Sequence, residues 1–135
     1  EPKCLSRPLY GFENTEHTIN NEGPYAFYYH NKIYLAYSGG DARGYLYAIG
    51  MLTANDGDDL CDLSVWEKAK TPIASFATIP GEYGPGHNSF FWDRDQNLWI
   101  AYHAVTSFEE KIVSSGMRRV YFEQDKTPRF DVIVE

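Results

Sequence analysis

The sequence lacks the features that mark membrane proteins and nucleic-acid-binding proteins. No apolar run approaches the roughly 20 residues that span a bilayer, and the opening Glu1-Pro2-Lys3 has neither the basic nor the apolar region of a signal peptide. The 12 Lys and Arg stand against 19 Asp and Glu, which gives a net charge of −7. That balance argues against nucleic acid or an anionic membrane as a partner, because both require a basic face. We expect a soluble protein, either cytoplasmic or secreted.

Cysteine is scarce, and the chain does not begin with methionine. The two cysteines, Cys4 and Cys61, lie far apart and outside any metal-ligand spacing. Free thiols are the favoured interpretation, a single disulfide is the alternative, and the compartment stays open. The start at Glu1 is consistent with a segment that was processed, trimmed or cut from something longer.

Aromatic residues, in contrast, are abundant. The 11 Tyr, 8 Phe and 3 Trp make up 16% of the 135 residues. Together with frequent glycine and the acidic charge, this composition is typical of β-rich proteins that handle carbohydrate, because the C–H faces of sugars stack on aromatic rings. The alternative is an all-β core filled with cross-strand aromatic pairs.

Short alternating runs, separated by turn residues, predict a single all-β domain. No stretch keeps the 3.6-residue period of a helix, although Asp58–Ser64 and Ser107–Ser114 are each compatible with one helical turn. The runs that have the pattern of strands are Tyr25–Tyr29, Lys32–Ser38, Tyr45–Thr53, Ser89–Trp92, Leu98–His103, Arg119–Glu123 and Phe130–Val134.

An internal repeat organises these strands into two units. Ala26–Ser38 is similar to Ser89–His103, with an offset of 63 residues at the front and 65 at the back. Each copy has a strand, a turn and a second strand, and a third strand follows at Tyr45–Thr53 or at Arg119–Glu123. A unit of about 60 residues matches a long blade of a β-propeller, which closes with four to eight blades. The chain therefore supplies about two blades, whose outer faces and edges stay open.

Two motifs occupy equivalent positions in the repeat. Asn21-Glu22-Gly23-Pro24 and Gly84-Pro85-Gly86-His87-Asn88 each stand just before the first strand of a copy. Because the innermost strand of every blade lines the central channel, we expect Glu22 and His87 to face one pocket at the same end of the axis. Glycine and proline fix rigid turns that aim these side chains. The alternative is a solvated turn carboxylate and a loop imidazole. His103, outside any metal-ligand spacing, is interpreted as a hydrogen-bonded core residue.

Further motifs follow in order along the chain, namely Ile33–Ser38, Trp66–Lys68, Ala101–Ala104 and the tail Arg119–Phe130. Together with the two motifs above, they resemble glycoside hydrolase family 43 from about Phe12 onward. The resemblance implies a five-bladed β-propeller, of which this chain is the C-terminal part. It divides the chain into a leading segment, residues 1–21, a first blade over about 22–83 and a closing blade over about 84–135.

The resemblance also implies a function. The family hydrolyses arabinofuranosides or xylosides of plant polysaccharides with inversion, so the implied partner is a pentose-containing carbohydrate. Glu22 takes the place of the general acid, and His87 takes the place of a histidine beside a metal ion, often calcium, or a water cluster. Arg119, or its neighbour Arg118, and Tyr37 are the candidate substrate-binding residues, and a surface or edge-strand charge is the alternative interpretation of the arginines.

The sequence departs from the family in one respect that matters for catalysis. An inverting site needs a base as well as an acid, and the family's base aspartate and acid-tuning aspartate belong to earlier blades. Nothing in residues 1–21 resembles their motifs, so this chain has half an active site. The leading hypothesis is part of an enzyme that is inactive without its other blades. The alternatives are a catalytically silent fragment that binds pentose sugars or serves as a scaffold, and an unrelated aromatic-rich sandwich.

The open blades generate the first prediction. We expect the purified chain to self-associate, or to associate with the missing blades, because two blades expose sheet faces and edges that a complete ring buries. Sedimentation velocity and light scattering should show a dimer or a larger species. A compact monomer over a wide range of concentrations would contradict this expectation.

Overall fold

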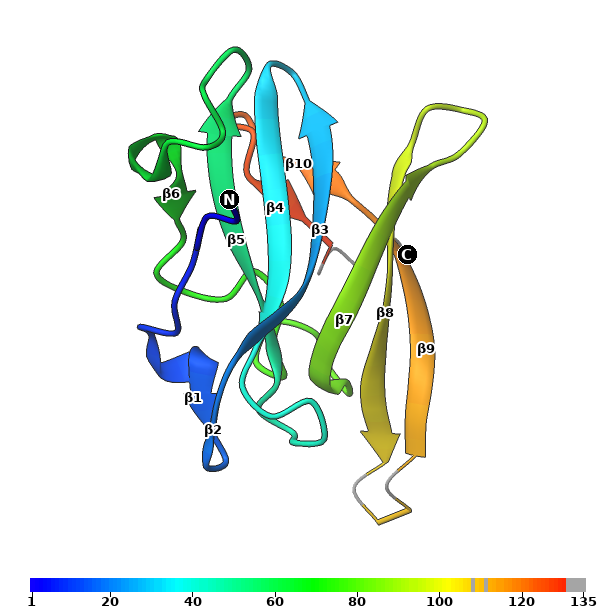
Figure 1. Cartoon of the computed structure of the whole chain (residues 1–135). Coiled ribbons are helices and arrows are strands. Elements are labelled where there is room, and N and C mark those ends of the chain that lie inside the picture. The colour runs from blue at the N-terminus through cyan, green and yellow to red at the C-terminus, as the bar shows by residue number, and fades with distance from the viewer. Residues whose placement is uncertain (108, 111, 131–135) are drawn as a thin grey trace.

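The computed structural model describes residues 1–107, 109–110 and 112–130, and this part of the chain is all-β, as predicted (Figure 1). Two antiparallel sheets lie side by side, with strand orders β3-β4-β5-β6 and β7-β8-β9. Two small hairpins, β1-β2 and β10-β11, complete the fold. No helix in the described residues is long and apolar enough to cross a membrane. The elements are η1 (Gly11–Glu13), β1 (Asn14–Thr15), β2 (Thr18–Ile19), β3 (Asn21–Tyr29), β4 (Lys32–Gly39), β5 (Ala48–Asn55), η2 (Leu63–Val65), β6 (Glu67–Lys68), β7 (Tyr83–Trp92), β8 (Leu98–Ser107), β9 (Ile112–Arg119), β10 (Tyr121–Phe122) and β11 (Pro128–Arg129).

The two glycine–proline motifs lie inside β3 and β7, so the prediction that they precede these strands was wrong. The pairing register shifts between Glu22 and Tyr25 in β3, and it shifts on both sides of Gly86 in β7. Gly23 and Gly84 have φ of +56° and +57°, values that glycine adopts at little cost. Each motif therefore forms a β-bulge within its strand, and such a bulge bends the strand and changes the direction of its side chains.

Strand β9 was not predicted. The sequence suggested a helical turn over Ser107–Ser114 and a third strand at Arg119–Glu123, but Ile112–Arg119 pairs with β8 along its length. β9 is an edge strand of mostly exposed residues, so it lacks the hydrophobic alternation that identifies a half-buried strand. At Gly116, a Cβ would lie 2.9 Å from the Tyr102 ring, so this strand needs a glycine where that ring packs.

Two other expected elements differ from the structure. The turn expected over Asp58–Ser64 is a 3₁₀ turn at Leu63–Val65. Of the strand expected over Phe130–Val134, residues 131–134 lie outside the described part of the chain.

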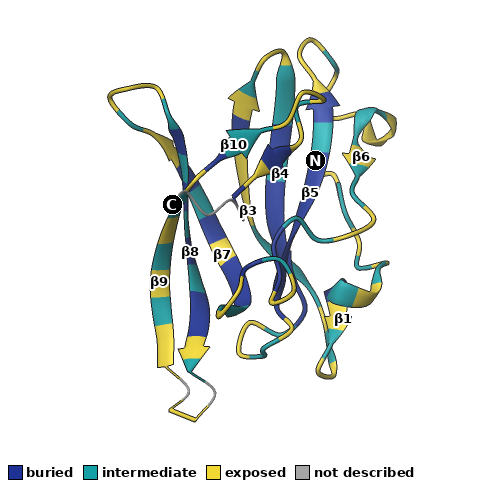
Figure 2. Cartoon of the chain, turned by 180° about the vertical axis from the view of Figure 1, so that it is seen from behind, coloured by how far each residue is buried: buried dark blue, intermediate teal, exposed yellow. Residues whose placement is uncertain are grey.

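The buried residues lie mainly on the central strands of the two sheets (Figure 2), and the core combines aliphatic side chains with several aromatic rings. Phe27 of β3 stacks on Tyr34 of β4, with ring centroids 4.8 Å apart. Phe27 also meets Phe90 of β7 at 4.5 Å, so one ring joins both sheets. Burying a side chain of this size contributes roughly 1.5–3 kcal/mol, so the contact between β3 and β7 holds the sheets together.

The C-terminal hairpin returns to the first sheet. Strand β10 passes behind β3 and β4 in Figure 1, and the Phe122 ring stacks on Tyr29 at a centroid distance of 3.6 Å. The Tyr34 hydroxyl donates a 2.7 Å hydrogen bond to the carbonyl of Lys126. The chain thus closes the aromatic core by connecting the end of the second sheet to the first.

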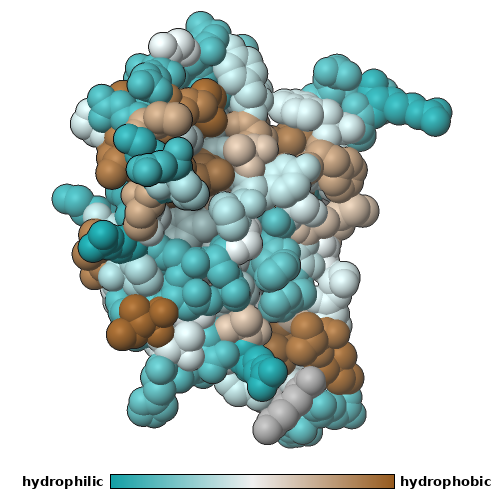
Figure 3. Space-filling view, viewed as in Figure 1, coloured by the Kyte–Doolittle hydropathy of each residue, from teal (hydrophilic) through white to brown (hydrophobic). Residues whose placement is uncertain are grey.

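Apolar side chains also remain on the surface. In the view of Figure 3 they form separate groups among hydrophilic residues. On β9, Val113 and Met117 are 62% and 60% exposed. They point away from the core, on the open side of the second sheet.

The carboxylate of Glu13 is fully buried, and it accepts hydrogen bonds from four separate segments of the chain. Its side chain has no exposed surface. Burial by itself raises the pKa of this carboxyl, but the ion pair with Lys68 and the surrounding hydrogen bonds lower it to about 2. It accepts hydrogen bonds at 2.5–2.8 Å from the backbone N–H groups of Leu9 and Tyr10, the amide of Asn21, the hydroxyl of Tyr37 and the ammonium of Lys68.

Replacing Lys68 tests this ion pair. Lys68→Met should lower the free energy of unfolding by ~3 kcal/mol, because a buried carboxylate then has no counter-charge. The folded pKa of about 2 lies below the ordinary value of 4.5, so the stabilisation is complete above pH 4.5 and is lost as pH falls towards 2. Urea unfolding at several pH values measures both effects. Lys70→Met, at an exposed site, removes the same charge as a control. Equal stability of the two variants would contradict the assignment.

Candidate active site

Glu22 lies at the β3 bulge, where it pairs with Ser38 of β4. Its Oε1 accepts a 2.7 Å hydrogen bond from the hydroxyl of Tyr47, a fully buried residue just before β5. Burial, together with the hydrogen bond to the Glu22 carboxylate, raises the pKa of the Tyr47 phenol far above its ordinary value. Tyr47 therefore stays a hydrogen-bond donor, and it fixes one oxygen of Glu22.

His87 lies at the β7 bulge and contacts the β3 bulge. Its backbone has φ of +53°, which is unusual for a residue with a side chain, and its N–H donates a 2.8 Å hydrogen bond to the Ser38 hydroxyl. The imidazole lies against Gly23, where a Cβ would be 3.6 Å from Nδ1. The structure thus brings the motif of Glu22 and the motif of His87 into contact between the start of β3 and the middle of β7.

His103 of β8 belongs to the same group of side chains. Its ring is nearly parallel to Tyr47 at 5.7 Å and to His87 at 6.3 Å. Burial and the neighbouring His87 lower the pKa of His103, so this imidazole is neutral near neutral pH. We refer to Glu22, Tyr47, His87 and His103 as the Glu22 cluster.

Sequence reasoning missed the roles of Tyr47 and His103. Tyr47 stood inside a predicted strand, and nothing in the sequence links it to a carboxylate 25 positions away. His103 was interpreted as a hydrogen-bonded core residue; it is half-buried, bonds to the backbone of Ala42 and is paired with Gly86 at the β7 bulge, which places it in the Glu22 cluster. The signal that could have found it is its place in the repeat, since it aligns with Ser38, the pairing partner of Glu22.

Asn88, next to His87, was quoted in its motif without a role. Its side chain is 5% exposed, and neither its Oδ1 nor its Nδ2 has a hydrogen-bond partner among the described residues. Buried amides are usually satisfied by protein or by an ordered water. Asn88 is therefore a second polar group, beside the Glu22 cluster, that can hold water or a ligand.

The other candidate site residues lie in different surroundings. Tyr37 is buried, and its hydroxyl donates to Glu13. It nevertheless lines a pocket of about 250 Å³ together with Glu22. Arg118 is bound to Glu82 at 2.7 Å and to the Tyr102 hydroxyl at 2.8 Å.

Arg119 lies at the far end of the second sheet. It pairs with Trp99, which pairs with Phe91 near the end of β7, whereas His87 lies in the middle of that strand. Arg119 is therefore remote from the Glu22 cluster.

The described residues do not form a complete metal site. They include no group of three or more His, Cys, Asp or Glu side chains that could hold an ion. Calcium takes six to eight oxygen ligands, whereas the Glu22 cluster and Asn88 together offer one carboxylate, one phenol, one amide and two imidazoles. A cation beside His87 would need water, or groups from elsewhere, for most of its coordination.

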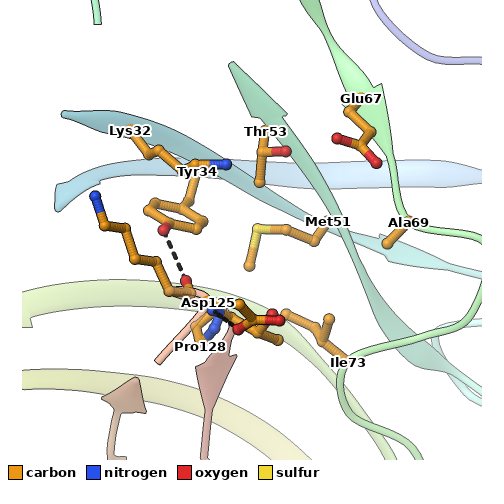
Figure 4. Close-up of a pocket in the computed structure, with 11 residues that line it drawn as sticks. Lys32, Tyr34, Met51, Thr53, Glu67, Ala69, Ile73, Asp125 and Pro128 are labelled. Carbon is orange, nitrogen blue, oxygen red and sulfur yellow. Dashed lines mark hydrogen bonds between the residues drawn. The ribbon is translucent and has the colours of Figure 1, made fainter. Parts of the chain in front are cut away.

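A further pocket, of about 290 Å³, lies between the first sheet and the C-terminal hairpin (Figure 4). Tyr34 and Met51 point into it from β4 and β5, with Asp125 on the opposite side. None of the residues of the Glu22 cluster lines it, so its size does not mark it as the active site.

Comparison with known proteins gives consistent matches. The model of the glycosyl hydrolases family 43 matches residues 5–128. The chain is 30% identical to an extracellular exo-α-(1→5)-L-arabinofuranosidase of Streptomyces avermitilis, over 98% of the chain and 29% of that protein. It is 38% identical to the protein of the same name from Streptomyces chartreusis, over 74% of the chain and 30% of that protein. The chain thus spans less than a third of these curated relatives.

Solved structures support the fold. The crystal structure of an α-L-arabinofuranosidase from Lactobacillus brevis is similar with a TM-score of 0.81 and 29% identity, over 93% of this chain and 41% of that one. A thermostable family-43 glycoside hydrolase gives 0.69 and 28%, over 90% and 39%. The prediction of about two blades of a five-bladed β-propeller is confirmed.

Gly86 tests how closely the cluster is packed. A Cβ at Gly86 would lie 2.1 Å from the Tyr47 ring, so Gly86→Ala must displace the residue that holds Glu22. We expect this variant to lose about 1–3 kcal/mol of unfolding free energy. Gly11→Ala is the control, because nothing lies within 4 Å of its Cβ. Urea unfolding should separate the two variants, and equal stability would contradict the packing described here.

Proposed function

Because the chain belongs to glycosyl hydrolases family 43, we propose that it supplies the acid half of an inverting active site that cleaves arabinofuranosides or xylosides. The observation that carries this proposal is the carboxyl group of Glu22, held by Tyr47 at 2.7 Å, in a motif whose Gly23 lies against the His87 ring. A carboxyl group fixed by a buried donor at the end of an innermost strand is suited to proton transfer.

The hydrogen bond from Tyr47 makes the two oxygens of Glu22 inequivalent. Since Oε1 accepts from Tyr47, the acidic proton is carried by Oε2. Oε2 donates this proton to the glycosidic oxygen as the bond between that oxygen and the anomeric carbon breaks. A water attacks the anomeric carbon from the opposite face and loses its proton to a base, roughly 6.5–9.5 Å from the acid in inverting enzymes. We propose that this base comes from blades outside the chain.

His103 and Asn88 provide the surroundings for the sugar. Because the pKa of His103 is lowered, its imidazole adds no positive charge to the cluster near neutral pH. Asn88 offers both a donor and an acceptor without a described partner, which suits a sugar hydroxyl or an ordered water. A cation beside His87 remains a proposal, and it would act by orienting water.

The activity of the relatives favours one substrate class. Both Streptomyces proteins are named as arabinofuranosidases, as is the enzyme from Lactobacillus brevis. We therefore propose an α-L-arabinofuranoside as the first substrate to test, with a xyloside as the second.

Substitution of Glu22 tests the proposed role. In a protein that contains all blades, Glu22→Gln should lower turnover of an aryl arabinofuranoside by about 10²–10⁴-fold. The loss should be smaller for dinitrophenyl substrates, whose leaving group needs little proton donation, than for alkyl glycosides. Glu67→Gln, at an exposed site, is the control. The 135-residue chain alone should show no turnover. Equal losses on good and poor leaving groups, or turnover by the chain alone that depends on Glu22, would refute the assignment.

A further inference from the structure

A pocket of about 190 Å³ lies at the C-terminal ends of the innermost strands, away from the Glu22 cluster. Tyr29 and Trp92, which line it, are the last residues of β3 and β7, whereas Glu22 lies near the start of β3 and His87 lies in the middle of β7. At roughly 3.3 Å per residue, the stretch from His87 to Trp92 separates the two sites by on the order of 15 Å. We call this site the far pocket.

The aromatic part of the far pocket is rigid and open. The Tyr29 ring stacks on the Phe122 ring at a centroid distance of 3.6 Å, and this contact fixes the Tyr29 ring. The Trp92 ring lies nearly parallel to the Tyr29 ring, with an interplanar angle of 21°. Trp92 is 43% exposed, so part of its indole is free to contact a ligand. Aromatic faces carry negative electrostatic potential, and the slightly positive C–H groups of a sugar ring are attracted to them.

The polar part of the far pocket is also fixed. The Arg119 guanidinium lies over the Tyr121 ring at 5.1 Å and donates from Nη2 to Oδ1 of Asn97. Asn97 is in turn held by the Asp93 carboxylate, at 2.8 Å from its N–H and 3.0 Å from its side-chain amide. Hydrogen bonds from Trp99 and from this turn lower the pKa of Asp93 to about 2. The arginine has five N–H donors, and the described residues use one of them here.

These features together define the ligand. A pocket of 190 Å³ is smaller than the roughly 300–1,000 Å³ of sites for drug-sized molecules, so it suits a single sugar residue. An aromatic platform beside a few fixed donors and acceptors is the lining that a neutral, hydroxyl-rich ring requires. No carboxylate lines the pocket among the described residues, so it has neither the acid nor the base that glycoside cleavage requires.

We propose that the far pocket is a second, non-catalytic binding site for one sugar residue of the polysaccharide that the enzyme cleaves. The identity of the polymer rests on the proposed function, whereas the pocket itself does not. Arg119, the candidate substrate-binding residue from the sequence, then contacts the polymer away from the bond that is cleaved. Binding at two ends of one propeller raises the effective concentration of the polymer at the active site.

The test compares a polymer with a small substrate. In the protein with all blades, Trp92→Ala and Arg119→Ala should each weaken binding of soluble arabinan or arabinoxylan about tenfold, as measured by affinity electrophoresis in a Glu22→Gln background that leaves the polymer intact. Trp92→Phe should retain most of the binding, which shows that the site is still folded. Matched controls are Phe76→Ala and Arg43→Ala, at exposed positions outside the far pocket. With Glu22 present, turnover of an aryl arabinofuranoside should stay within about twofold.

Two results would overturn the proposal. Polymer binding by Trp92→Ala and Arg119→Ala that equals that of their controls would show that the far pocket binds no polysaccharide. A loss of aryl arabinofuranoside turnover in these variants as large as their loss of polymer binding would show that the pocket belongs to the catalytic site. Failure of the proposed function has a different signature, since aryl turnover would then not depend on Glu22, whatever the polymer result.

Discussion

The buried charge of Glu13 is the constraint on which the first sheet depends. An ionised carboxylate without exposed surface is tolerated only when its oxygens are fully bonded, and Glu13 meets that condition with groups from four separate parts of the chain. One of these groups is Asn21, the residue before Glu22. The start of β3, where the proposed acid lies, is therefore fixed by an ion pair that does not itself face the active site.

Steric constraints act on the same few residues. The β3 and β7 bulges approach each other so closely that Gly23 contacts the His87 ring and Gly86 contacts the Tyr47 ring. A Cβ at Gly86 would lie 2.1 Å from the Tyr47 ring, so this contact requires glycine. At Gly23 the space would admit a Cβ, and the φ of +56° is what favours glycine. The glycines of the two motifs thus have a packing role at one position and a backbone role at the other.

Local patterns and the internal repeat were sufficient to predict the all-β fold and most strands, because equivalent positions in repeated units occupy equivalent places. They also predicted that Glu22 and His87 face one pocket, and the structure brings their two motifs into contact at Gly23. Three features escaped prediction. The Glu13–Lys68 ion pair joins residues 55 positions apart that carry no shared motif. The contact of Tyr47 with Glu22 depends on the bulge in β3. Strand β9 takes its conformation from pairing with β8, which a polar edge sequence does not encode.

The return of the C-terminal hairpin to the first sheet has a consequence for biosynthesis. The hydrogen bond from Tyr34 to Lys126 spans 92 positions, and the Phe122 ring that covers Tyr29 is translated after the whole second sheet. Such long-range contacts form late, because loop closure must precede them. During synthesis on the ribosome, one aromatic surface of the first sheet stays uncovered until residues 121–130 emerge. Chaperones that recognise exposed aromatic segments would find their target in this interval.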